Sequence, residues 1–121
     1  MKSCLVVDDS KVIRKVARRI LEELAFEIVE AEDGRQALEA VDVQVPDLIL
    51  LDWNMPIMDG MEFMQKVRAR TDIDQPVIVF CTTENDMAHI REAMEYGANE
   101  YIMKPFDREI IEAKLSQVGL I

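Results

Sequence analysis

The sequence predicts an α/β protein in which a parallel β-sheet is covered by helices on both faces. Short apolar runs of strand length alternate with longer segments whose apolar residues recur at helical spacing. The strand-like runs are apolar at nearly every position, as expected for strands that are buried on both faces. Strands and helices that alternate in this way form parallel sheets with helical crossovers. The length of 121 residues fits one such domain.

In the first half of the chain, apolar runs bounded by acids or turn residues predict strands at residues 4–7, 26–31 and 48–51. The first helix follows, with Asp9 or Ser10 as its cap. Its predicted inner face comprises Val12, Ile13, Val16, Ala17, Ile20, Leu21 and Leu24. A turn at residues 33–34 leads into the second helix at residues 36–43.

The second half continues the alternation, with strands predicted at residues 77–80 and 100–103. Three helices are indicated by apolar residues at positions 61, 63, 64 and 67, at 87, 90, 93 and 94, and at 110, 111, 113 and 115. Gly60, Gly97 and Pro105 mark the breaks between these segments.

Right-handed crossovers restrict five such strands to a doubly wound sheet, for which we expect the flavodoxin-like order 2-1-3-4-5. Ligands of these sheets bind at the carboxyl ends of the strands. The residues at these ends are Asp8-Asp9, Asp52, Thr82 and Lys104-Pro105. Because strands 1, 3, 4 and 5 are neighbours in this order, three carboxylates, a hydroxyl and an ammonium group are predicted to meet at one edge.

Three carboxylates at one edge need a proton or a cation among them. Like charges about 4 Å apart repel by roughly 4 kcal/mol at an effective dielectric constant of about 20. Oxygen ligands favour a hard cation, and a site with few protein ligands and open positions suits Mg²⁺ better than Ca²⁺. The sequence also lacks the D-x-D-x-D-G loop of EF-hand sites. Asp8, Asp9 and Asp52 are therefore candidate Mg²⁺ ligands.

Each part of this site has a simpler interpretation by itself. Asp8 and Asp9 could do no more than favour the start of the following helix, where acids are stabilising. Asp52 could be a solvated loop acid, and Lys104 could be an ordinary surface lysine. Their joint placement at neighbouring strand ends favours one functional site over unrelated surface residues.

This set of residues resembles the response-regulator receiver family of two-component signalling, and the resemblance extends from residue 4 to about residue 118. Within it, Asp52–Gly60 is most similar to the stand-alone, CheY-type chemotaxis response regulators. The resemblance implies that Asp52 is a phosphoacceptor. Its donor would be a phosphohistidine on a partner histidine kinase or phosphotransfer protein.

The resemblance also implies roles for the neighbouring residues. Asp9 would bind Mg²⁺ directly and Asp8 mainly through water, while the backbone carbonyl of Asn54 would complete the protein ligands. Lys104 and Mg²⁺ would neutralise charge on the phosphoryl oxygens, and Thr82 would hydrogen-bond one of these oxygens. The Lys104-Pro105 bond would be cis.

Four further positions are interpreted through the same resemblance. Tyr101 would be an aromatic switch that changes the surface of helix 4, strand 5 and helix 5, although it could also be a core tyrosine with a satisfied hydroxyl. Asn54 and Glu84 would help to place the water that hydrolyses the acyl phosphate, which implies a short-lived signal. Thr83 departs from the small Ala or Gly that often stands at this position. Its larger side chain could narrow access to Asp52, so the rates at which small donors phosphorylate Asp52 and water hydrolyses the acyl phosphate are left open.

Five cations lie within nine residues of the first helix, on the face predicted to be opposite its apolar stripe: Lys11, Arg14, Lys15, Arg18 and Arg19. This face could simply be solvated. The alternative is a docking surface for the kinase or phosphotransfer partner, formed by Lys11, Arg14, Lys15 and Arg18. His89, the only histidine, is interpreted as a surface residue.

The composition excludes several classes of protein. A formal net charge of −10 argues against binding to nucleic acid. No apolar run is long enough to cross a bilayer and no signal peptide is apparent, so a cytoplasmic protein is expected. Cys4 and Cys81 lie in strand-like runs and are predicted to be buried free thiols.

We therefore expect a monomeric, single-domain response regulator, residues 1–121, without an effector domain. It would catalyse its own phosphorylation and dephosphorylation without being an enzyme for a separate substrate. Its target would be a protein such as a flagellar motor switch or a kinase, in chemotaxis or motility. A phosphate sink and a phosphorylation-independent interaction module remain open as alternatives. An FMN carrier and a D-x-D-x-T phosphatase are disfavoured because their loops are missing.

Overall fold

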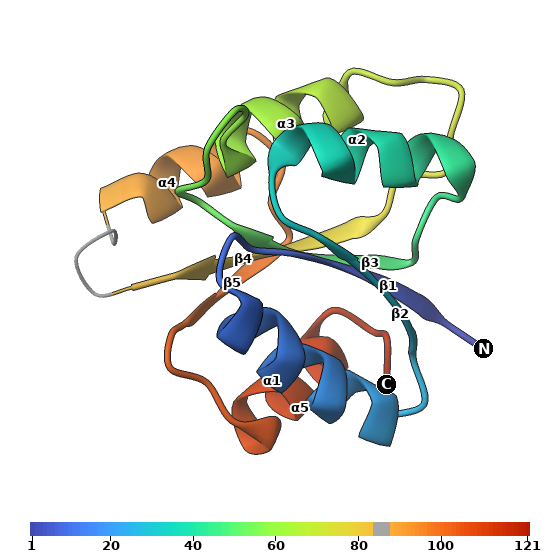
Figure 1. Cartoon of the computed structure of the whole chain (residues 1–121), viewed down its shortest axis with the longest axis vertical. Coiled ribbons are helices and arrows are strands. Elements are labelled where there is room, and N and C mark those ends of the chain that lie inside the picture. Colours follow the sequence, from blue (N-terminus) through green and yellow to red (C-terminus); the bar gives the residue numbers. More distant parts are fainter. Residues whose placement is uncertain (84–87) are drawn as a thin grey trace.

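Strands and helices alternate along the chain in the computed structural model, which describes residues 1–83 and 88–121 (Figure 1). The strands are β1 (Ser3–Val7), β2 (Glu27–Ala31), β3 (Leu48–Asp52), β4 (Val77–Thr82) and β5 (Glu100–Met103). The helices are α1 (Lys11–Glu23), α2 (Gly34–Val43), α3 (Gly60–Arg68), α4 (Ala88–Glu95) and α5 (Arg108–Gln117). The predicted alternation is confirmed, with boundaries that differ by a few residues.

The strands form one parallel sheet in the order β2-β1-β3-β4-β5, which confirms the predicted flavodoxin-like topology. Helices α2, α3 and α4 cover one face, and α1 and α5 cover the other (Figure 1). The central strand β3 is buried at every position, whereas the edge strand β2 exposes alternate residues. Since both faces are covered, polar side chains at the central strands can reach solvent only at the strand ends.

Two hydrophobic clusters hold the sheet between the helical layers. The cluster under α2 and α3, called here the upper cluster, includes Leu51 of β3 and Phe63 and Met64 of α3. The lower cluster lies against α1 and α5 and includes Leu21 and Leu115. Truncation of any of these side chains to Ala is expected to reduce the free energy of unfolding by roughly 2–5 kcal/mol. Within the described residues, no helix is both long and apolar enough to cross a membrane.

Cys4 and Cys81 are buried in the lower cluster as free thiols, as predicted. Burial raises the pKa of both thiols, and that of Cys81 reaches about 12. Both residues therefore stay protonated at neutral pH and act as small apolar core residues.

Polar caps determine where the helices begin. Ser10, and not Asp9, caps α1, because its Oγ accepts the hydrogen bond from the N–H three residues further on. Asp33 caps α2 in the same way, so this helix begins at Gly34, earlier than the apolar spacing predicts. The side chains of Asp59 and Asp107 cap α3 and α5.

The predicted inner face of α1 is wrong in part. Val12 and Val16 are 71% and 40% exposed, whereas Arg14, predicted on the outer face, is only 7% exposed. Arg14 occupies an inner position because its guanidinium has polar partners there. Its Nε donates to Glu30, and its Nη1 donates to the main-chain carbonyl of Asp8. Apolar spacing contains no information on such partners, and a buried Arg14 cannot belong to an exposed docking surface.

Candidate functional site

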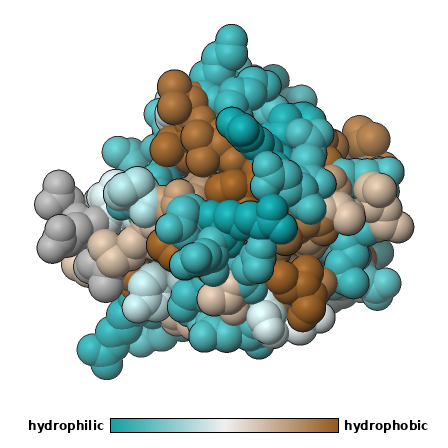
Figure 2. Space-filling model, turned by 90° about the horizontal axis from the view of Figure 1, so that it is seen from below, coloured by the Kyte–Doolittle hydropathy of each residue, from teal (hydrophilic) through white to brown (hydrophobic). Residues whose placement is uncertain are grey.

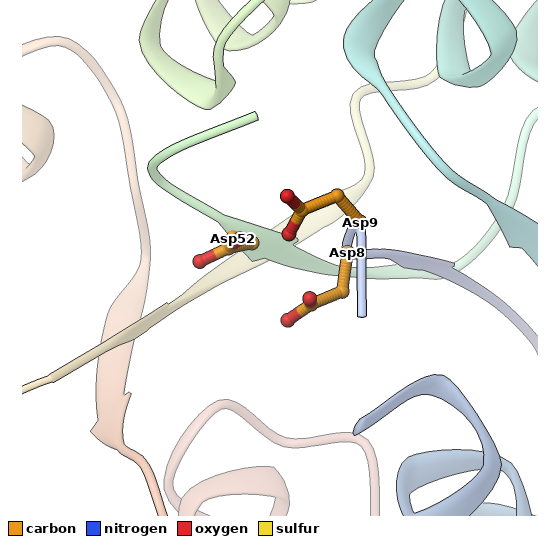
Figure 3. A group of neighbouring side chains, drawn as sticks. All are labelled: Asp8, Asp9 and Asp52. Atoms are coloured by element: carbon orange, nitrogen blue, oxygen red, sulfur yellow. The ribbon is translucent and has the colours of Figure 1, made fainter. Parts of the chain in front are cut away.

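Three carboxylates meet at the carboxyl ends of β1 and β3. Asp8 and Asp9 directly follow β1, and Asp52 is the last residue of β3. One oxygen from each carboxylate lies within 4.8 Å of the others, and we call these residues the acid cluster (Figure 3). Asp8 and Asp52 are buried and Asp9 is exposed, so the cluster is accessible from one side. The strand order thus brings together the three acids that the sequence places at strand ends.

Lys104 supplies a cation from the end of β5. Its main-chain N–H donates to the carbonyl of Thr82 at 2.6 Å, and its peptide bond to Pro105 is cis. Its Nζ donates to Asp8 Oδ2 at 2.7 Å and to Asp52 Oδ1 at 2.8 Å. The ammonium group therefore bridges two members of the acid cluster, although neither of their strands is a neighbour of β5.

Burial raises the pKa of Asp52 from its usual 3.8 to about 6. The hydrogen bond from Lys104 acts in the opposite direction, while the charges of Asp8 and Asp9 raise the pKa further. Asp52 is therefore mostly ionised at neutral pH, and its carboxyl becomes protonated when the pH falls below about 6. A divalent cation at the cluster would favour the ionised form, which is the form that a carboxylate nucleophile requires.

The ammonium group of Lys104 stays charged through the neutral range. Burial alone would lower its pKa, but the hydrogen bonds to Asp52 and Asp8 outweigh burial and raise it. A fixed positive charge beside these carboxylates can stabilise negative charge on a group bound there.

The residues predicted to assist the chemistry lie close to Asp52 as far as the structure describes them. Thr82 is 3% exposed and ends β4, which pairs with β3 as far as Asp52. Asn54 follows two residues after Asp52 and is exposed. Glu84 lies outside the described residues.

Tyr101 lies in the edge strand β5, between the core and the surface. Its ring is partly buried against the upper cluster. Lys114 of α5 places its Nζ 5.2 Å from the ring centroid, within the range of a cation–π interaction. The same Lys114 pairs with Glu100 at 3.4 Å. A rotation of the Tyr101 ring would therefore change the surface shared by β5 and α5.

Glu30 of β2 binds three of the four cations predicted to dock a partner. Its carboxylate accepts hydrogen bonds from Arg14 at 3.1 Å, Lys15 at 3.0 Å and Arg18 at 2.6 Å. Burial by itself would raise the pKa of Glu30, but these hydrogen bonds together lower it to about 2. Lys11 is exposed and has no ion pair within residues 1–83 and 88–121. Arg14, Lys15 and Arg18 thus form one network with Glu30, whereas Lys11 is an exposed cation.

A stacked pair of rings beside the site was not predicted from the sequence. The imidazole of His89, in α4, lies on the indole of Trp53 with ring centroids 4.0 Å apart and planes inclined by 17°. Trp53 follows Asp52 directly and also contacts Phe80 at a centroid distance of 6.2 Å. The stack joins α4 to the loop after β3. The one available signal was the position of the sole tryptophan next to the candidate nucleophile.

The model of the response regulator receiver domain family matches residues 4–116. The chain belongs to this family. Chemotaxis protein CheY1 of Helicobacter pylori is 39% identical over 116 residues, which are 94% of each chain. The CheY homolog of Campylobacter jejuni is 38% identical over 119 residues, 94% of this chain and 89% of the relative. The solved structure of chemotaxis response regulator CheY4 of Vibrio cholerae has 35% identity and a TM-score of 0.89, with 98% of both chains covered.

The donor set of this receiver domain fits a metal ion. Its three carboxylates are close enough to share one ion, and one of them is exposed to solvent, from which an ion can enter. Burial raises the pKa of Asp52 and the charges of Asp8 and Asp9 raise it further, so a cation held between these carboxylates would favour the ionised form of Asp52. Oxygen donors of this kind bind hard divalent cations.

Proposed function

We propose that this receiver domain is a CheY-like response regulator that accepts a phosphoryl group on Asp52 with Mg²⁺ as cofactor and then binds a target protein. One observation carries the proposal: Lys104 hydrogen-bonds Asp52 and Asp8 at the edge where Asp9 is exposed. This geometry combines a nucleophile, a set of cation ligands and a fixed positive charge. Phosphoryl transfer depends mainly on such positioning and electrostatic stabilisation.

In the proposed reaction, a carboxylate oxygen of Asp52 attacks the phosphorus of a phosphohistidine on the partner. The new O–P bond forms as the P–N bond breaks, and the released imidazole nitrogen keeps the electron pair and takes up a proton. The acid cluster and the main-chain carbonyl of Asn54 would hold Mg²⁺, which would neutralise charge on the phosphoryl oxygens. Lys104 would then pair with a phosphoryl oxygen in place of the Asp52 oxygen that it contacts now.

The signal would reach the surface through Thr82 and Tyr101. The hydroxyl of Thr82 donates to the carbonyl of Thr83 at 3.3 Å in this structure. After phosphorylation it would turn towards a phosphoryl oxygen, and the Tyr101 ring would move inward. The cation–π contact with Lys114 would then be lost, and the face formed by α4, β5 and α5 would change for its target.

The proposed donor is a histidine kinase or a histidine phosphotransfer protein, and the proposed target is a protein such as a flagellar motor switch or a kinase. The names of the relatives in Helicobacter pylori and Campylobacter jejuni support a role in chemotaxis. On this proposal the protein catalyses only its own phosphorylation and dephosphorylation. It would work in the cytoplasm, where such donors are made from ATP.

The lifetime of the acyl phosphate is proposed to depend on Asn54 and Glu84, which would place the hydrolytic water. The exposure of Asn54 beside Asp52 supports access of water to that side of the site. Substitution of Asn54 by a larger residue should therefore lengthen the half-life of the phosphorylated protein.

The partner is proposed to dock on the start of α1, next to the acid cluster. Lys11 and Val12 are exposed there, and the side chain of Lys15 is 57% exposed although it pairs with Glu30. Figure 2 shows the side of the molecule formed by α1 and α5, where hydrophobic and hydrophilic side chains lie in adjoining patches. A surface of mixed basic and apolar character suits an acidic partner.

Charge reversal tests the docking surface. Lys11→Glu should slow transfer from the phosphorylated kinase and leave phosphorylation by acetyl phosphate unchanged. Lys66→Glu, an equal change in charge at an exposed position of α3, is the matched control. Equal slowing with both donors, or equal effects of the two variants, would rule out docking through Lys11.

Fluorescence of Trp53 tests the proposed function, because this sole tryptophan adjoins Asp52. Addition of Mg²⁺ should give a saturable change, and beryllofluoride, a phosphoryl mimic, should give a second change. Asp52→Asn should abolish the second change. A wild-type protein that responds to neither addition would contradict the proposal.

A further inference from the structure

Arg14 contacts the main chain of Asp8, the first residue of the acid cluster, and its side chain is only 9% exposed. Its Nη1 donates to the main-chain carbonyl of Asp8 at 2.8 Å, and its Nε donates to Glu30 Oε1 at 3.1 Å. One planar guanidinium thus connects β2 to the first residue of the cluster. Lysine cannot reproduce this contact, because a single ammonium group lacks the rigid fork of N–H donors.

The polar groups of Asp8 are held by four hydrogen bonds. Its N–H donates to Ala31, and its Oδ1, Oδ2 and carbonyl oxygen accept from Ser10, Lys104 and Arg14 respectively. Of these bonds, the one from Arg14 is made to the peptide unit that joins Asp8 to Asp9. The orientation of this peptide sets the direction in which the Asp9 side chain leaves the main chain. Arg14 therefore acts on Asp9 without contacting its carboxylate.

We propose that Arg14 is a positioning residue for the cation site: it fixes the Asp8–Asp9 peptide so that the acid cluster converges, and Glu30 fixes Arg14. Glu30 can do so because Lys15 and Arg18 hold its other oxygen at 3.0 Å and 2.6 Å. This inference rests on the proposed binding of Mg²⁺ by the acid cluster. Arg14, Lys15 and Arg18, which the sequence suggests as docking residues, thus also support the cation site through Glu30.

Charge and geometry predict opposite effects for the loss of Arg14. As a buried cation near a cation site, Arg14 opposes Mg²⁺ binding by electrostatic repulsion. As the donor that orients the peptide, it favours Mg²⁺ binding, and groups that orient metal ligands typically change metal affinity by about 10- to 100-fold. Removal of the guanidinium therefore tightens binding if its charge dominates and weakens binding if its positioning dominates.

The test measures the dissociation constant of Mg²⁺ by calorimetry and by Trp53 fluorescence in wild type, Arg14→Met and Arg14→Lys. Met keeps the apolar stem without the charge, and Lys keeps the charge without the fork. We expect both variants to bind Mg²⁺ about tenfold more weakly. Unchanged or tighter binding by Arg14→Met would overturn the inference. Failure of the wild type to bind Mg²⁺ would instead overturn the proposed function.

Arg68→Met separates positioning from a general loss of stability. Arg68 also uses its guanidinium to join segments, since it donates to the carbonyls of Gly97 and Pro76. These residues precede β5 and β4, at the amino-terminal ends of the strands and away from the acid cluster. Its loss should lower the free energy of unfolding without changing the dissociation constant of Mg²⁺. If Arg68→Met weakens Mg²⁺ binding as much as Arg14→Met does, the inference fails.

A double-mutant cycle tests the role given to Glu30. Glu30→Gln should weaken Mg²⁺ binding in the same direction as Arg14→Met, because it loosens the guanidinium. The double variant should bind no more weakly than Arg14→Met alone, since both changes interrupt one chain of contacts. Fully additive losses would show that Glu30 acts independently of Arg14.

Discussion

Lys104 Nζ lies 2.8 Å from Asp52 Oδ1, although the two residues are 52 positions apart in the chain. The contact spans three strands, because Lys104 follows β5, Asp52 ends β3 and β4 lies between them. The proposed phosphoacceptor is therefore already paired with the cation that is proposed to assist transfer. This pairing has consequences that single substitutions can measure.

Lys104→Met should slow phosphorylation by acetyl phosphate about 100- to 1,000-fold at saturating Mg²⁺, because a fixed donor to the transferred group is lost. Mg²⁺ binding should be no weaker than in wild type, since Lys104 competes for oxygens of Asp8 and Asp52. The measurements are the phosphorylation rate and a Mg²⁺ titration. Lys66→Met, on the surface of α3, provides the control, and a Lys104→Met variant with wild-type rates would contradict the role of Lys104.

Asp52→Asn should stabilise the metal-free protein at neutral pH. The pKa of Asp52 is about 6 in the folded state, above its usual 3.8, so the folded state binds more protons between these values and loses stability as the pH rises through them. Removing the ionised carboxyl should raise the free energy of unfolding by about 1–3 kcal/mol at pH 7.5. The pKa of about 6 already includes the opposing effect of Lys104, so the loss of this ion pair is part of the expected gain.

Urea unfolding in a chelator measures this effect. The advantage of Asp52→Asn should shrink as the pH is lowered towards 4, where the wild-type carboxyl also becomes neutral. Asp74→Asn, at an exposed position, should show no comparable pH dependence. A stability difference that is the same at both pH values would contradict the raised pKa of Asp52.

Gly60→Ala should disturb the acid cluster by displacing the main chain of Asp52. A Cβ at Gly60 would collide with the main-chain carbonyl of Asp52, and Gly60 also donates its N–H to the carbonyl of Trp53 at 3.0 Å. We expect a loss of about 1–3 kcal/mol in the free energy of unfolding together with weaker Mg²⁺ binding. Gly119→Ala is a suitable control: its φ of +80° makes a side chain strained there, yet no neighbour lies within 4 Å. It should lower stability without changing Mg²⁺ affinity.

The convergence of Asp8, Asp52 and Lys104 could be predicted from the sequence because it depends on few facts. Apolar runs define the strands, crossover handedness limits their order, and polar residues at strand ends must then meet. The same reasoning failed for Arg14, since hydrophobic spacing describes burial of apolar groups and takes no account of a guanidinium that is buried with its partners. Val12 and Val16 show the converse: their spacing predicts an inner position, yet both lie at the surface.

The stack of His89 on Trp53 could not be predicted, because ring contacts depend on the exact path of loops and not on strand order. His89→Ala should uncover one face of the indole. The emission of Trp53 should then shift to longer wavelength and become more sensitive to quenching by acrylamide. His89→Phe should preserve the stack and the wild-type response. Identical quenching of wild type and His89→Ala would show that the stack does not persist in solution.

The most direct test of the central claim is to locate the phosphoryl group. The protein is incubated with acetyl phosphate and Mg²⁺, the acyl phosphate is reduced with borohydride to homoserine, and the modified residue is identified by peptide mass spectrometry. Modification at Asp52, dependent on Mg²⁺ and absent in Asp52→Asn, is the predicted result. Modification at another residue, or none in the wild type, would contradict the assignment of Asp52 as the phosphoacceptor.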